Sequence, residues 1–148
     1  MSANLLFLYG PSGAGKTRLF QMITESCNER SVMRVGSEQI VNDMMRCFEN
    51  RNYQDFFDKY SSVKNLLVDN IWILRSRPNA AKEIGRLINE RVKLGNLTLL
   101  ASDLVYQDVV RTLPAIGDCL EKNGAIHLSL GQRDPEGYMR SLRVSGQA

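Results

Sequence analysis

The fold is decided by the stretch LLFLYGPSGAGKT, residues 5–17. Its first five residues are continuously apolar and stop at a Gly-Pro pair, which is typical of a parallel strand buried on both faces. From Thr17 onward apolar residues recur at helical spacing, namely Leu19, Phe20, Ile23 and Cys27. The sequence therefore predicts a strand, a glycine-rich loop and a helix in direct succession.

The glycine-rich loop matches the pattern G-x-x-x-x-G-K-[ST] at every position. Glycines let the backbone curl so that several N–H groups point at one anion, and the following helix adds its positive end. We expect Lys16 to reach the β- and γ-phosphates and the Thr17 hydroxyl to bind Mg²⁺; a glycine turn without a ligand is the alternative. The residues expected to hold ATP or ADP are Gly10, Pro11, Ser12, Gly13, Ala14, Gly15, Lys16, Thr17 and Arg18.

The rest of the chain alternates between strand and helix patterns. Further strands are expected at 32–35, 65–69, 97–101 and 125–130, and helices after Ser37, around Phe56–Tyr60 and at 79–94. Ser37 is a candidate cap for the helix that follows it. This order predicts one α/β domain over residues 1–148, a P-loop NTPase sandwich with a five-stranded parallel sheet flanked by helices.

Composition excludes several classes of protein. The chain of 148 residues is 43% hydrophobic and 24% charged, which suits one globular domain rather than a disordered chain. No apolar run approaches the roughly 20 residues that span a bilayer. The net charge of +3 is too small to indicate a nucleic-acid-binding protein by itself. Cys27, Cys47 and Cys119 show no metal or redox spacing, which favours buried thiols and a cytoplasmic location.

Asp69 ends the strand at 65–69 and is the expected second half of the nucleotide site. A carboxylate at the end of a buried strand would hold the magnesium shell opposite Thr17, although an ordinary strand-end cap is the alternative. Asn70 follows, where ATPases with this strand usually carry a second carboxylate that polarises the attacking water. Asparagine has no basicity, so we expect nucleotide binding with little general-base help.

Several stretches together resemble the ATPase core of DnaA, the bacterial replication initiator, and the AAA+ helicase loaders. The resemblance covers the chain from Leu5 to about Asp103 and thins afterwards. The stretches that carry it are Leu8–Gly13 with Gly15–Thr17, Val41–Asp43, Phe57–Tyr60, Leu66–Ile71 and Leu99–Asp103. Their order and spacing, more than the phosphate loop alone, point to this family.

The resemblance implies roles for several residues. Lys16, Thr17 and Asp69 look like the phosphate and magnesium residues, and Asp103 like the polar residue that senses the γ-phosphate. For Asp103, a helix N-cap for the segment from Leu104 remains open. The helices between Ser37 and Tyr60 match the region with which such initiators grip single-stranded DNA. Arg46, Arg51 and Lys59 are the candidate phosphate contacts there, or else part of a solvated surface.

The chain departs from the family pattern at several points. Asn70 replaces the second acid, and residues 116–123 contain Lys122 but no arginine finger. We also expect a core reduced at both ends, trimmed or naturally short, without the adenine-side segment and without a complete lid. Residues 133–148, with Pro135 and Arg140, are expected to begin a lid helix.

Three functions stay open at this point. The first is an ATP-binding switch or assembly element in DNA replication with weak or absent hydrolysis. The second is a pseudo-ATPase that serves as an interaction module. The third is a small metabolite kinase. A kinase needs a lid rich in arginines, and the loop after Asp103 contains only Arg111, which disfavours this function. Expected partners are nucleotide, single-stranded DNA, other AAA+ replication proteins or further copies of the chain, and no membrane.

Overall fold

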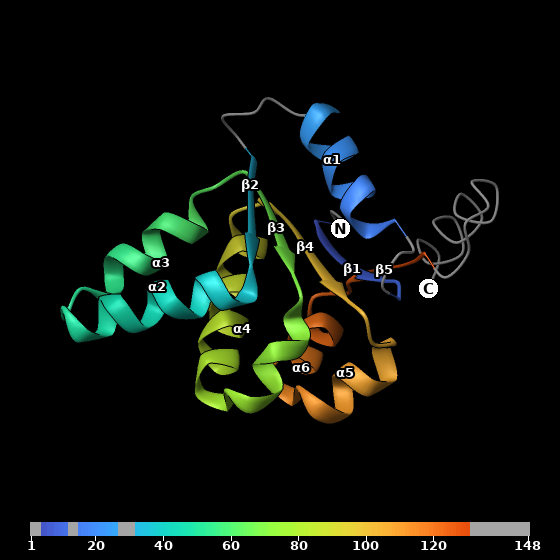
Figure 1. The fold of residues 1–148 in the computed structure, drawn as a ribbon. Helices are drawn as coiled ribbons and strands as arrows, with labels where there is room; N and C mark the ends of the chain where they lie inside the picture. The colour runs from blue at the N-terminus through green and yellow to red at the C-terminus, as the bar shows by residue number, and fades with distance from the viewer. Residues whose placement is uncertain (1–3, 12–14, 27–31, 131–148) are drawn as a thin grey trace.

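The computed structural model describes residues 4–11, 15–26 and 32–130, and within them strands and helices alternate as the sequence predicts (Figure 1). The strands are β1 (Leu5–Tyr9), β2 (Val32–Gly36), β3 (Asn65–Asp69), β4 (Leu97–Ser102) and β5 (Ile126–Ser129). The helices are α1 (Lys16–Ser26), α2 (Ser37–Glu49), α3 (Tyr53–Ser61), the 3-10 helix η2 (Ile71–Ser76), α4 (Pro78–Lys93), α5 (Tyr106–Thr112) and α6 (Pro114–Lys122).

All five strands are parallel and lie in the order β2-β3-β4-β1-β5. The predicted five-stranded parallel sheet with flanking helices is therefore confirmed. Because the strands are parallel, the loop that follows β1 emerges at the carboxyl edge of the sheet, where parallel α/β folds bind their ligands, and β1 lies inside the sheet between β4 and β5.

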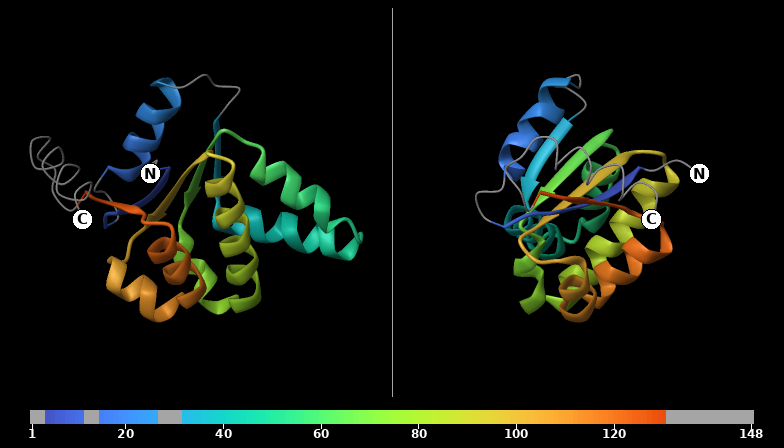
Figure 2. Two further views of the ribbon diagram at one scale, coloured as in Figure 1. Left: turned by 180° about the vertical axis from the view of Figure 1, so that it is seen from behind. Right: turned by 90° about the vertical axis from the view of Figure 1, so that its right-hand side faces the viewer.

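The sheet separates two apolar clusters of unequal size. The larger cluster joins one face of the sheet to α2, α3, η2, α4, α5 and α6. The smaller cluster packs Leu19 and Phe20 of α1 against Leu8, Leu67 and Leu99. Figure 2 shows α1 on the opposite side of the sheet from α4, α5 and α6. This arrangement places the beginning of α1, and with it Lys16, beside the carboxyl ends of β1, β3 and β4.

Two expectations about local structure were wrong. Ser37 does not cap α2, because the N-cap residue is Gly36 and no side chain bonds the first turn. Asp103 does not cap α5, which begins at Tyr106 with Val105 as its N-cap residue. Cys119 is buried as predicted and Cys47 is half-buried, while Cys27 lies outside the described residues. No helix in the described ranges has the length and apolar character needed to cross a bilayer.

A buried arginine ties the amino ends of two strands to the helices beside them. Arg91 of α4 is fully buried. Its guanidinium donates to the carbonyls of Tyr60 (2.7 Å), Val63 (2.6 Å) and Leu97 (2.6 Å) and to the Thr98 hydroxyl (2.7 Å). Burial lowers the pKa of Arg91 to about 10, so the group stays charged at neutral pH. Without Arg91, the buried carbonyl of Tyr60 would need another donor inside the protein.

Helices α5 and α6 pack closely at Gly117. A Cβ atom added at Gly117 would lie 2.9 Å from the Cα of Val110, which is backbone and cannot rotate away. Gly85 of α4 faces α6, but a Cβ atom added at Gly85 would lie 3.4 Å from the carbonyl oxygen of Ala115, which is an ordinary contact distance. A methyl group would therefore clash at Gly117 but not at Gly85, so the second glycine can serve as the control for the first.

We expect Gly117→Ala to lower the free energy of unfolding by about 1–3 kcal/mol, because the extra methyl group forces two helices apart. Gly85→Ala should leave the free energy of unfolding unchanged or raise it by up to about 1 kcal/mol, since alanine favours a helix interior. Urea denaturation of both variants checks this. Equal stability of the two variants would show that the α5–α6 contact is looser than described.

Candidate nucleotide site

The phosphate loop begins in a fixed backbone position at the carboxyl end of β1. The N–H of Gly10 donates to the carbonyl of Ser102 in β4 (3.1 Å), and Gly10 is buried. At the far end of the loop Gly15 has a φ of +105°, a conformation that favours glycine, and its carbonyl accepts the N–H of Leu19 (2.9 Å) as α1 begins. Ser12, Gly13 and Ala14 lie outside the described residues.

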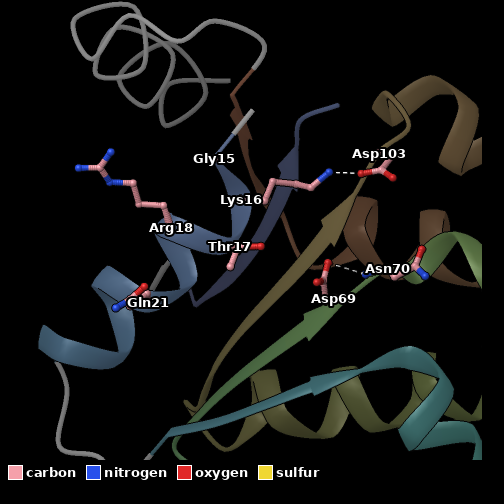
Figure 3. A pocket seen from close by; sticks show the side chains of 8 residues that line it. All are labelled: Gly15, Lys16, Thr17, Arg18, Gln21, Asp69, Asn70 and Asp103. Carbon is pink, nitrogen blue, oxygen red and sulfur yellow. Dashed lines mark hydrogen bonds and ion pairs between the residues drawn. The ribbon is translucent and has the colours of Figure 1, made fainter. Parts of the chain in front are cut away.

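A pocket of about 600 Å³ opens between the start of α1 and the ends of β3 and β4 (Figure 3). Its lining brings together residues from three separate segments of the chain: Gly15, Lys16, Thr17, Arg18, Gln21, Asp69, Asn70 and Asp103. Seven of these eight were predicted from the sequence as site residues. Pro11 is exposed and, with Gly10, does not line the pocket.

Lys16 is held at the centre of this site. Its ammonium group donates to the carbonyl of Gly10 and forms an ion pair with the carboxylate of Asp103. The Lys16 side chain is 13% exposed, whereas that of Asp103 is 57% exposed. The Lys16 side chain is thus largely buried and points to the end of β4, where an anion would compete with Asp103 for the charge of the lysine.

Thr17 and Asp69 fit a hard cation such as Mg²⁺. Both line the pocket, and Figure 3 shows the Thr17 hydroxyl on the side of α1 that faces Asp69. One carboxylate oxygen of Asp69 accepts the N–H of Asn70 (2.8 Å). Within the described ranges no three His, Cys, Asp or Glu side chains cluster as a metal cage. Mg²⁺ is commonly bound by one or two protein oxygens together with substrate phosphates and water, which suits this donor set.

Asn70 lies at the edge of the pocket in a strained conformation. Its φ of 56° and ψ of 54° fall in the left-handed region, which asparagine tolerates better than most residues, and it is the N-cap residue of η2. Its side chain is exposed and lines the pocket. A neutral amide here can donate and accept hydrogen bonds, but it cannot remove a proton from water.

The remaining lining residues come from α1. The Arg18 side chain points away from Lys16 (Figure 3). Gln21, one turn further along, donates its amide to Glu25 (3.2 Å) and was not predicted as a site residue. Its spacing from Thr17 and Arg18 on one helix was the signal that could have found it.

The three predicted DNA contacts lie away from the pocket, on the hairpin of α2 and α3 that extends beyond β2 (Figure 1). Arg46 and Lys59 both pair with Asp43, which also accepts the Tyr60 hydroxyl. Burial raises the pKa of Asp43, but the hydrogen bonds from Tyr60 and Lys59 and the nearby charges outweigh it and bring the pKa below its usual value. Arg51 lies in the turn between the helices with a φ of 57°. Two of the three cations are therefore already engaged by a carboxylate.

Comparisons with known proteins agree with this geometry. Residues 1–114 match the family model described as the bacterial DnaA ATPase domain. The chromosomal replication initiator protein DnaA of Campylobacter fetus is 36% identical over 99 residues, which is 65% of this chain and 23% of that protein. The chain spans about a quarter of the length of the curated relatives it matches.

Solved structures show the same fold. AMPPCP-bound DnaA from Aquifex aeolicus superimposes with a TM-score of 0.77 at 25% identity, covering 86% of this chain and 40% of that one. A replication initiator DnaA bound to AMPPCP and single-stranded DNA gives a TM-score of 0.76 at 25% identity, with the same coverage. The five-stranded sheet and its flanking helices therefore match the AAA+ domain of DnaA structures.

Proposed function

This chain belongs to the bacterial DnaA ATPase domain family, and from that premise we propose that it binds Mg-ATP or Mg-ADP as a switch or assembly element in DNA replication. The observation that carries the proposal is the placing of Lys16, Thr17 and Asp69 around one pocket at the carboxyl edge of the sheet. Lys16 would bind the β- and γ-phosphates, and Thr17 and Asp69 would hold the magnesium ion that screens them. Relatives solved with AMPPCP support this assignment.

Lys16→Ala should weaken binding of Mg-ATP and of Mg-ADP at least about tenfold, because a charge-assisted contact to phosphate is lost. Isothermal titration calorimetry measures both affinities. Lys82→Ala removes an exposed lysine of α4 and serves as the control with unchanged affinity. Equal affinity of the wild type and Lys16→Ala would contradict the proposal.

We further propose that hydrolysis by this chain is slow. Asn70 supplies no base beside Asp69, and α6 with the residue after it, 114–123, contains no arginine. An arginine finger is worth roughly 10³–10⁵ in the rate of related phosphoryl transfers. A metabolite kinase is disfavoured, because Arg111 pairs with Asp108 and does not line the pocket.

Phosphate release from Mg-ATP by the wild-type chain should therefore stay near the uncatalysed background. Asn70→Asp should raise the rate by about 10²-fold, the lower range of general-base catalysis, since aspartate restores a basic oxygen in the same place. Asn70→Ser restores no base and should leave the rate at background. A wild-type turnover of several per second would contradict slow hydrolysis. An unchanged rate in an Asn70→Asp variant that binds nucleotide would contradict the missing base as its cause.

Single-stranded DNA is the second proposed ligand, supported by the relative solved with such a strand. The proposed contacts are Arg46, Arg51 and Lys59 on the α2–α3 hairpin. Residues 37–61 carry three basic and five acidic side chains, a net charge of 3 − 5 = −2, so one copy should bind weakly. Three phosphate contacts predict a shallow salt slope of about −2 for a single strand. Binding would therefore need several copies side by side.

Asp43→Asn should strengthen binding of labelled oligo-dT, because it releases Arg46 and Lys59 while its amide oxygen can still accept the Tyr60 hydroxyl. Fluorescence anisotropy at low salt, with and without ATP, measures the affinity. Asp58→Asn makes the same change of charge on the exposed face of α3 without releasing either cation, and should have a smaller effect. No binding by any of the three proteins with ATP present would refute the DNA proposal.

A further inference from the structure

Asp69 lies at the point where two strands of the sheet separate. The pairing of β3 with β4 ends at Val68 and Leu100, whereas β4 continues beside β1 as far as Tyr9 and Ser102. Asp69 is therefore one residue beyond the last pair on its β4 side. On its other side it is level with Gly36, the last residue of β2. The carboxylate at the pocket thus depends on β2 and α2 for its position.

The side chain that supplies this support is Ser37. It is fully buried, and its hydroxyl donates to the backbone carbonyl of Asp69 (3.0 Å). A serine in the first turn of a helix commonly bonds the unpaired N–H groups there, but no side chain caps α2. The hydroxyl instead links the start of α2 to the end of β3, 32 residues away.

Two groups then fix Asp69 from both directions. Ser37 holds the carbonyl, and the N–H of Asn70 holds one carboxylate oxygen at 2.8 Å. Within the described part of the chain no contact engages the other carboxylate oxygen, and Asp69 lines the pocket opposite Thr17. Rotation of the Asp69 backbone would carry the carboxylate away from Thr17, so the Ser37 bond limits the movement that matters for a shared cation.

We propose that Ser37 is a positioning residue for the magnesium side of the nucleotide site: its buried hydroxyl holds the carbonyl of Asp69 so that the carboxylate faces Thr17. This inference rests on the proposed binding of Mg-nucleotide. It concerns only the part of the affinity that Mg²⁺ adds. Lys16 and the phosphate loop would contact phosphate directly, and neither belongs to β3.

The test compares the dissociation constant of ADP in EDTA with that in Mg²⁺, and the ratio of the two is the magnesium gain. Ser37→Ala should reduce the magnesium gain about fivefold, the order expected for one lost hydrogen bond, and leave the constant in EDTA unchanged. Asp69→Asn should abolish the gain. Ser61→Ala, at a buried serine of α3 away from the pocket, should keep it.

A merely structural role for Ser37 would lower stability without changing the magnesium gain. A full gain in folded Ser37→Ala therefore overturns the Ser37 proposal and leaves nucleotide binding standing. Absence of nucleotide binding by the wild type overturns the proposed function and the Ser37 role together.

Hydrogen exchange of the wild type gives an answer even where Ser37→Ala does not fold. Addition of Mg²⁺ to the ADP-bound chain should slow exchange at 69–72 and at 37–40 together, because the Ser37 hydroxyl joins these two segments. Protection at 69–72 with no change at 37–40 would overturn the proposal.

Discussion

The buried guanidinium of Arg91 is the interaction on which the arrangement of β3 and β4 depends. It bonds carbonyls just before β3 and at the first residue of β4, and so fixes the amino ends of both strands relative to α3 and α4. The strands run parallel from this anchor, and their opposite ends lead to Asp69 and Asp103. A cation buried without a carboxylate is tolerated because several oxygens surround it.

Strands β3 and β4 are held together at their amino ends and are unpaired with each other at their carboxyl ends. At the amino ends, Arg91 draws the backbones together. At the carboxyl ends, pairing stops at Val68 and Leu100, and the strands diverge around the pocket. Separated strands leave backbone groups without ladder partners, and the hydroxyl of Ser37 meets one of them at Asp69. The lost strand pairing beside the pocket is thus compensated locally by α2, which is also the first helix of the α2–α3 hairpin.

Sequence reasoning succeeded where the signal was local. The apolar run before Gly10, the loop pattern and the carboxylate after Val68 each occupy a few adjacent residues, and they gave β1, the pocket and Asp69. It failed for Ser37, whose acceptor lies 32 residues away, so the pattern offered only a helix cap. Helix α6 was not predicted, and a helix near α5 entered only as the open alternative in which Asp103 caps the segment from Leu104.

Arg91 was missed for a different reason. It falls seven residues after Ile84 and three after Ile88, on the apolar stripe of α4, where its position alone indicated burial. What the stripe could not reveal was the set of acceptors, since they belong to segments that precede and follow α4. A charged residue in register with an apolar face is a signal of buried hydrogen bonding that sequence analysis can use.

The charges at the pocket support the proposal that phosphate and a metal ion bind there together. Lys16 and Arg18 balance Asp69 and Asp103, so the lining residues carry no net charge. A phosphate that takes Lys16 from Asp103 leaves a carboxylate that is 57% exposed and stays hydrated, while the lysine is 13% exposed and keeps a partner. The same phosphate brings negative charge toward Asp69, and a divalent cation between them converts that repulsion into attraction. In the proposed site Lys16 would therefore attract the anion, and a metal ion would add to the affinity by offsetting the repulsion between the phosphate and Asp69.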